Sequence, residues 1–153
     1  MTSPAMVARV AATQRIVDEW RYRPFAWGVA DCGRLAAAML TALGHSPRLA
    51  RFGYYRSAAG AARSLRRRGF SDVGGVLDDL GLTRIPQASA LPGDLVGFRQ
   101  VELGQDLAVS VAVGNGRVLG FMDNGDGAVL CHVFPPRMDA AAADYLAWRA
   151  DPL

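Results

Sequence analysis

The chain has 153 residues, of which 51% are hydrophobic and 20% are charged, as is typical of one globular domain over residues 1–153 with a substantial core. No apolar run approaches the roughly 20 residues that cross a bilayer, and no basic-then-apolar stretch begins the chain, so we expect neither a membrane span nor a signal peptide. The net charge of +3 is too modest to point to a polyanionic partner.

Helical spacing of apolar residues and capping side chains predict four helices in the first half of the chain. The second is alanine-rich and is preceded by an aspartate, a good N-cap because its carboxylate accepts a bond from an otherwise unpaired backbone N–H. We expect these helices over residues 4–21, 32–43, 58–68 and 72–80, capped by Ser3, Asp31, Ser57 and Ser71.

The third helix carries the one cluster of basic residues: Arg63, Arg66, Arg67 and Arg68. No aromatic residues are interleaved with this cluster, so a solvated helix face is the favoured interpretation over a phosphate-binding patch. We therefore expect no nucleic-acid partner. Binding to DNA that falls steeply with salt would contradict this expectation.

The second half of the chain has the pattern of β-structure, with short apolar segments separated by Gly, Asn, Asp and Pro. In residues 107–113 large and small side chains alternate strictly, and Gly114-Asn115-Gly116 predicts a hairpin turn after them. We expect strands over residues 82–85, 94–98, 107–113, 117–121 and 128–134.

Helices followed by an antiparallel sheet predict an α+β domain with the helices packed on one face of the sheet. In the 107–113 strand the small side chains, Ala108, Ser110 and Ala112, share one face. An alanine-rich helix approaches most closely where the opposing side chains are short, so we expect the helix that begins at Cys32 to cross this small face.

Cys32 lies in the first turn of its predicted helix, directly after the Asp31 cap. Unpaired N–H groups and the helix dipole favour an anion there, which makes a thiol a better thiolate and a candidate nucleophile. The alternative is that Cys32 is a small buried apolar residue.

The two cysteines, Cys32 and Cys131, do not suggest a disulfide framework in a chain without a signal peptide. Neither has metal-ligand spacing, and neighbours such as Cys131 and His132 point to opposite faces of a strand. The turn at 123–127 lacks the spaced ligands and terminal glutamate of a calcium loop. We expect no metal and no cofactor.

Three motifs together resemble those of the NlpC-type papain-like cysteine peptidases of bacteria and phages. They are the aromatic-Gly-x-x-Asp-Cys entry to a helix at 27–32, the Pro-Gly-Asp-Leu-Val-x-Phe strand at 92–98, and the strand pair around 108–116. The resemblance implies a papain-like NlpC-type fold and a peptidoglycan-degrading ancestry, with Cys32 at the position of the nucleophile.

Two further features are similar to a phage and prophage branch of that superfamily: Gly53-Tyr54-Tyr55 and the terminal Ala147-Trp148-Arg149. That similarity implies a virion protein of a phage-type tail tip or hub, made in the bacterial host cytoplasm. The partners that it implies are other tail-tip or hub proteins and possibly peptidoglycan.

The resemblance fails at the catalytic base. The family's histidine begins the strand that here starts at Ala108, and alanine cannot accept a proton. A register shift of two places Ser110 there, which is no base at neutral pH. The further polar residue expected on the next strand, near Gly120, is also absent from the sequence. General-base help is worth roughly 10²–10⁴-fold in rate.

The sequence has two other candidates for the base, His45 and His132. His45 follows the far end of the Cys32 helix, which at 1.5 Å per residue puts it roughly 15 Å or more from the thiol. His132 could reach Cys32 if its strand lay beside 107–113 with the imidazole toward the helix. The alternative is a partly buried histidine bonded to backbone.

Two functions follow as hypotheses. The first is a structural tail-tip component built on a degenerate peptidase fold, in which Phe52, Tyr54 and Tyr55 are candidates for protein contact, unless they belong to the core. The second is an active cell-wall cysteine endopeptidase or amidase that aids genome entry, with Cys32 as nucleophile and His132 as base.

Overall fold

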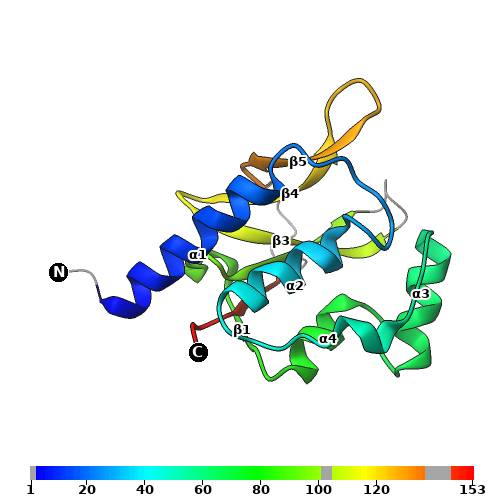
Figure 1. Cartoon of the computed structure of the whole chain (residues 1–153), viewed down its shortest axis with the longest axis horizontal. Coiled ribbons are helices and arrows are strands. Elements are labelled where there is room, and N and C mark those ends of the chain that lie inside the picture. The colour runs from blue at the N-terminus through cyan, green and yellow to red at the C-terminus, as the bar shows by residue number, and fades with distance from the viewer. Residues whose placement is uncertain (1–2, 101–104, 137–145) are drawn as a thin grey trace.

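The computed structural model of the chain describes residues 3–100, 105–136 and 146–153. Figure 1 shows the helices gathered on one side of a twisted sheet, with both described ends of the chain on the same side of the molecule. None of the helices in these three ranges is both long enough and apolar enough to span a membrane.

The four helices form where the sequence predicts them. Their bounds are Pro4–Trp20 (α1), Cys32–Ala42 (α2), Ala58–Arg67 (α3) and Val73–Asp79 (α4), with 3-10 turns at Leu49–Phe52 (η1) and Gln87–Ser89 (η2). The caps Ser3, Asp31 and Ser57 are confirmed, since each side chain accepts a bond from a backbone N–H of the first turn. The expected Ser71 cap is wrong: Asp72 caps α4, and its carboxylate accepts from the Gly75 N–H at 3.1 Å.

Six strands form one sheet in the described part of the chain. They are Thr83–Ile85 (β1), Leu95–Gln100 (β2), Gln105–Gly114 (β3), Arg117–Asp123 (β4), Val129–Phe134 (β5) and Leu146–Arg149 (β6). Their order is β1-β6-β2-β3-β4-β5, and each neighbouring pair is antiparallel. The α+β class with helices on one face is confirmed.

The outer edge of β5 is covered by the segment that joins α1 to α2. The Tyr22 N–H donates to the Cys131 carbonyl at 2.7 Å, the Cys131 N–H donates to the Arg23 carbonyl at 2.9 Å, and the Phe25 N–H donates to the Val129 carbonyl at 2.9 Å. An uncovered edge strand invites pairing with another chain, so this segment protects the sheet while it carries the chain toward α2.

The main core lies between the helices and the sheet, and it overturns one expectation. The large residues of β3, Val109 and Val111, pack with Leu35, Met39 and Leu40 of α2. The small residues Ala108, Ser110 and Ala112 therefore lie on the far face of the sheet, which is the face opposite the helices.

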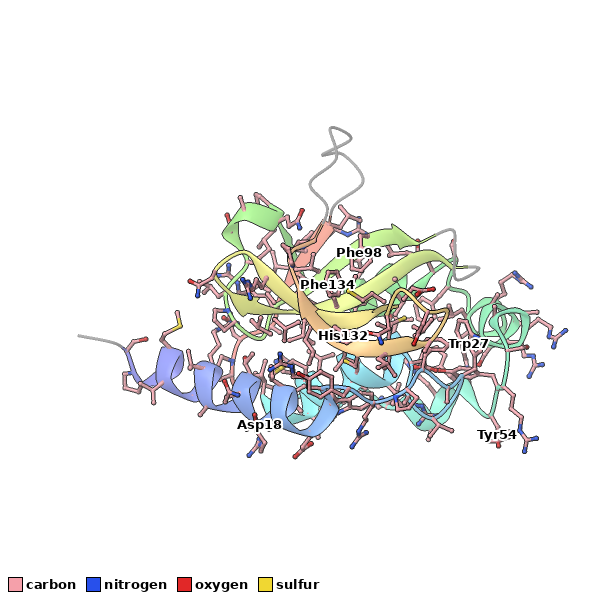
Figure 2. The ribbon with its side chains drawn as sticks, turned by 90° about the horizontal axis from the view of Figure 1, so that it is seen from above. Asp18, Trp27, Tyr54, Phe98, His132 and Phe134 are labelled. Carbon is pink, nitrogen blue, oxygen red and sulfur yellow. The ribbon has the colours of Figure 1, made fainter. Side chains whose placement is uncertain are left out.

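The far face uses its small residues to make room for aromatic rings. The rings of Phe98 and Phe134 meet there with centroids 6.3 Å apart, and Figure 2 shows both on the side of the sheet away from the helices. A Cβ at Gly120 would lie 3.0 Å from the Cβ of Ser110 and 3.5 Å from the Phe134 ring. Short side chains on β3 and β4 thus fit rings of the flanking strands, not the alanine-rich helix.

A buried ion network joins α1, the start of β2 and the end of β6. Asp94 is fully buried, and its carboxylate accepts bonds from Arg9 Nη1 at 2.8 Å and from Arg149 Nε at 2.9 Å. The N–H groups of Leu91 and Ala150, both at 2.9 Å, complete its shell. The aspartate of the Pro-Gly-Asp motif therefore has a role in holding the fold together.

Candidate functional site

Cys32 is the first residue of α2, and its side chain is partly exposed. The cap that precedes it, Asp31, is 1% exposed. Its carboxylate accepts three hydrogen bonds, each of 2.8 Å, from the Gly28 N–H, the Arg34 N–H and the Tyr55 hydroxyl. Asp31 thus fixes the loop before the cysteine, the first turn of α2 and the segment after η1 in one arrangement.

Gly28 explains the spacing of the Trp-Gly-x-x-Asp-Cys motif. Its φ is +75°, a conformation that side chains disfavour, and a Cβ there would lie 2.1 Å from the Tyr55 carbonyl oxygen. Glycine at this position lets the loop pass against the Tyr55 backbone while its N–H reaches Asp31.

Tyr55 is held as a neutral donor. Burial of its phenol, and then the nearby Asp31 carboxylate, raise its pKa well above the ordinary value of 10.0. At neutral pH the hydroxyl therefore stays protonated and donates a hydrogen bond to the Asp31 carboxylate. Sequence reasoning placed Tyr55 as a contact residue, and nothing in the local pattern marked it as the partner of the cap 24 residues earlier.

A cavity of about 180 Å³ lies between α2, α3 and α4, with Cys32 among the residues that line it. Most of the lining is apolar, contributed by the inward sides of the three helices and by η1. Its polar groups include Asp31, Cys32, Arg34, Tyr55, Ser64, Ser71 and Asp72. A mostly apolar cavity with a few polar groups in its lining has the composition of a small-molecule site.

The residue that β3 contributes to this cavity is Leu107. Ala108, predicted to occupy the position of the catalytic histidine, is buried and on the far face. Ser110, the alternative in that register, is also on the far face, where its hydroxyl donates to the Val96 carbonyl at 3.1 Å. Among the described side chains of β3, Leu107 is therefore the one that lines the cavity with Cys32, and its hydrocarbon side chain cannot act as a base.

Neither histidine lines the cavity that contains Cys32. His45 Nε2 lies 2.7 Å from the Asp151 carbonyl, beyond the C-terminal end of α2. His132 is on β5, and β4 separates that strand from β3, so the condition for its approach to Cys32 is not met. Its imidazole lies on the far face, edge-on to Tyr22 with centroids 5.9 Å apart, and its buried Nε2 has no hydrogen-bond partner among the described residues.

Cys131, the second thiol, is fully buried in the main core. Burial raises its pKa to about 12, against a smaller opposing effect of Arg23. It is chemically distinct from the partly exposed Cys32 and behaves as a core residue. Within the described ranges no group of three or more His, Cys, Asp or Glu side chains could hold a metal ion.

The three aromatic candidates for protein contact separate in the structure. Tyr54 is 73% exposed, and Figure 2 shows it projecting from the surface. Phe52 packs against Phe70 with centroids 6.2 Å apart, and Tyr55 is half-buried against Asp31. Tyr54 alone of these three presents its ring to solvent.

Trp148, from the Ala-Trp-Arg end of the chain, is fully buried, and its Nε1 donates to Asp78 at 2.9 Å. A Cβ on Gly97 would lie 2.9 Å from the Trp148 ring, so that glycine is required by packing. This motif, like the Pro-Gly-Asp motif, is explained by the fold itself.

No curated protein and no solved structure matches this chain. A family model does match it over residues 7–143, and that family is described as a domain of unknown function, DUF6950. Because the match covers most of the sequence, the chain belongs to the DUF6950 family.

Proposed function

We propose that this protein is a structural component of a phage-type tail tip or hub, built on a peptidase-like fold without hydrolase chemistry. One observation carries the proposal: the thiol of Cys32 lines an apolar cavity with Leu107, while neither histidine of the chain reaches that cavity. A cysteine hydrolase needs an imidazole beside the thiol to form the ion pair and to protonate the leaving group.

The roles of the motif residues support the same proposal. Asp31 and Asp94 stand in two of the motifs that resemble those of the peptidases, Trp148 stands in the Ala-Trp-Arg feature of the phage branch, and each of the three has a structural partner in its place. These motifs therefore explain the architecture with no catalytic role. The location in a tail follows from the similarity of the sequence to phage and prophage proteins, and it is the part of the proposal that needs its own test.

Thiol reactivity tests the chemistry. Alkylation of Cys32 by iodoacetamide is followed by mass spectrometry between pH 5 and 9, with Cys32→Ser as the control. We expect slow reaction at pH 6 that accelerates as pH rises, because general-base activation by an imidazole is missing. Rapid alkylation near pH 6 would contradict the proposal.

Cell-wall turnover tests the alternative, an active peptidoglycan endopeptidase or amidase with Cys32 as nucleophile and His132 as base. We expect no release of peptide from purified peptidoglycan, with wild type and Cys32→Ala alike. Turnover that both Cys32→Ala and His132→Ala abolish would establish the enzyme.

The location in a phage-type tail is tested separately, by mass spectrometry of purified tail particles, in which the chain should be present.

A further inference from the structure

The most basic part of the molecule is residues 53–71, which carry five arginines and no aspartate or glutamate. Since the whole chain has a net charge of +3 and this segment contributes +5, the rest of the chain carries −2. The net positive charge of the protein therefore lies on and beside α3, at one extremity of the molecule (Figure 1).

The fold shapes this charge into a hollow of about 350 Å³, which we call the arginine pocket. Arg63 and Arg67, one turn apart on α3, line it together with Arg56, Tyr54 and Tyr55. The guanidinium of Arg56 lies 5.0 Å from the centroid of the Tyr54 ring, and its Nε donates to the Tyr54 hydroxyl at 3.0 Å.

The arginines of this pocket are not neutralised by the described part of the chain. Arg56, Arg63 and Arg67 are exposed, and among the described residues none of the three has a carboxylate within 4.0 Å. By contrast Arg51, also next to α3, pairs with Asp79 at 3.2 Å. Like charges at i and i+4 destabilise a helix, so repulsion between Arg63 and Arg67 lowers the stability of α3, and a bound anion would relieve that repulsion.

We propose that the arginine pocket binds the carboxylates of an acidic segment of another protein. This rests on the proposed function, and it names the chemistry of a partner in the assembly. Arginine and tyrosine are the residues enriched at energetically important interface positions. A guanidinium binds a carboxylate through two parallel bonds. Residues at i and i+4, such as Arg63 and Arg67, have Cβ atoms about 5–6 Å apart on the same helix face, so both guanidinium groups can reach neighbouring acidic side chains.

A nucleic acid fits the pocket less well. The −2 charge of the rest of the chain opposes binding of a long polyanion, and one face of the exposed Tyr54 ring is covered by Arg56. A short acidic segment that contacts only α3 and residues 54–57 meets the positively charged region without approaching the negatively charged rest of the chain. The structure adds an aromatic neighbour that the sequence pattern does not indicate, because Tyr54 lines the same pocket as Arg63 and Arg67 although no aromatic residue is interleaved with the cluster.

The test measures binding of a short fluorescein-labelled poly-L-glutamate by fluorescence anisotropy, at about 50 mM and about 200 mM salt. We expect saturable binding that weakens at the higher salt, and a loss of at least about tenfold in Arg63→Glu/Arg67→Glu. The matched control is Arg15→Glu/Arg117→Glu, which makes the same change in net charge at exposed arginines of α1 and β4 and should retain most of the binding.

An equal loss in the control, or duplex DNA that binds more tightly than poly-L-glutamate, would overturn the proposal. Arg63→Gln/Arg67→Gln, with its thermal unfolding measured in parallel, guards against misfolding and should also bind weakly. The alkylation of Cys32 should be unchanged in all these variants. Failure of poly-L-glutamate binding would therefore contradict only the role of the arginine pocket. The proposal that the protein is not a hydrolase is decided separately, by the alkylation and peptidoglycan experiments.

Discussion

Two buried aspartates organise two regions of this molecule, and they do so with different donors. Asp31 accepts from two backbone N–H groups and a tyrosine, all within residues 28–55. Asp94 accepts from two backbone N–H groups and from the guanidinium groups of Arg9 and Arg149, which lie 85 and 55 residues away in the sequence. The first arranges the local structure around the cysteine, and the second connects parts of the chain that are remote from each other.

The difference lies in charge compensation. Asp94 and Arg9 are both almost completely buried, and removing one partner of such a pair leaves a charge in a medium that solvates it poorly. Asp31 is equally buried, but the three groups that donate to it are uncharged, so its removal leaves unsatisfied hydrogen-bond donors. The two sites therefore predict a ranked set of effects on stability.

The largest effect is expected at Asp94. Asp94→Asn should lower the free energy of unfolding by about 3–5 kcal/mol, because Arg9 loses its buried counter-charge. Urea denaturation followed by circular dichroism measures it. The control is Asp151→Asn, which removes the exposed partner of the same arginine and should cost less than about 1 kcal/mol. Equal losses in the two variants would show that burial is not what makes Asp94 important.

A smaller effect is expected at Asp31. Asp31→Ala should lower the free energy of unfolding by about 1–3 kcal/mol, through the lost N-cap and two further bonds. Asp72→Ala, which removes the cap of α4, is the matched control and should cost about 1 kcal/mol. Hydrogen exchange should localise the Asp31 effect to the start of α2 and residues 28–34. A change spread evenly over the sheet would contradict the local role of this cap.

At neutral pH the last effect is absent, and it appears only as the pH becomes alkaline. Tyr55 and Cys131 have raised pKa values in the folded protein, so the unfolded chain releases their protons first and stability is lost as pH rises. The loss should begin above about pH 9, the ordinary value for the thiol, and steepen above 10. Cys131→Ala should move the onset of this loss of stability to higher pH. Cys131→Ala/Tyr55→Phe should make the free energy of unfolding depend still less on pH.

The same pH experiment sharpens the comparison of the aspartates. The side-chain donors to Asp94 are guanidinium groups, whereas the side-chain donor to Asp31 is the phenol of Tyr55. Asp31→Asn weakens one of the causes that raise the pKa of Tyr55, and it should therefore reduce the loss of stability above pH 10. An identical alkaline profile in wild type and Asp31→Asn would contradict the link between this carboxylate and the phenol.

The elements of the fold could be predicted from the sequence because their causes are local. Ser3, Asp31 and Ser57 cap helices through bonds to N–H groups three residues away, and Asn115 tolerates the positive φ of its hairpin. The exception at α4 is also local: Ser71 and Asp72 are both good caps, and the pattern could not choose between two neighbours of similar propensity.

The face of β3 could not be predicted in the same way. Alternation separates large from small residues, but it does not say which set meets the helices. Close approach of an alanine-rich helix predicts that the small set meets α2. That prediction is wrong, because Val109 and Val111 pack with Leu35, Met39 and Leu40. The rings of Phe98 and Phe134, from strands on either side, needed the space left by the small residues.

The sequence by itself determined four helices and five of the six described strands to within two residues of their ends, and that Cys32 stands at a capped helix start; the strand Leu146–Arg149 was not among the expected ones. These depend on hydrogen bonds and periodicities that span a few residues. The tertiary structure alone decided that β4 lies between β5 and β3 and that Leu107 lines the cavity. It also decided that the Tyr55 hydroxyl donates to the N-cap Asp31 and that Arg9 forms an ion pair with Asp94. Those outcomes depend on which distant segments become neighbours, and such pairings follow from the packing of the whole core.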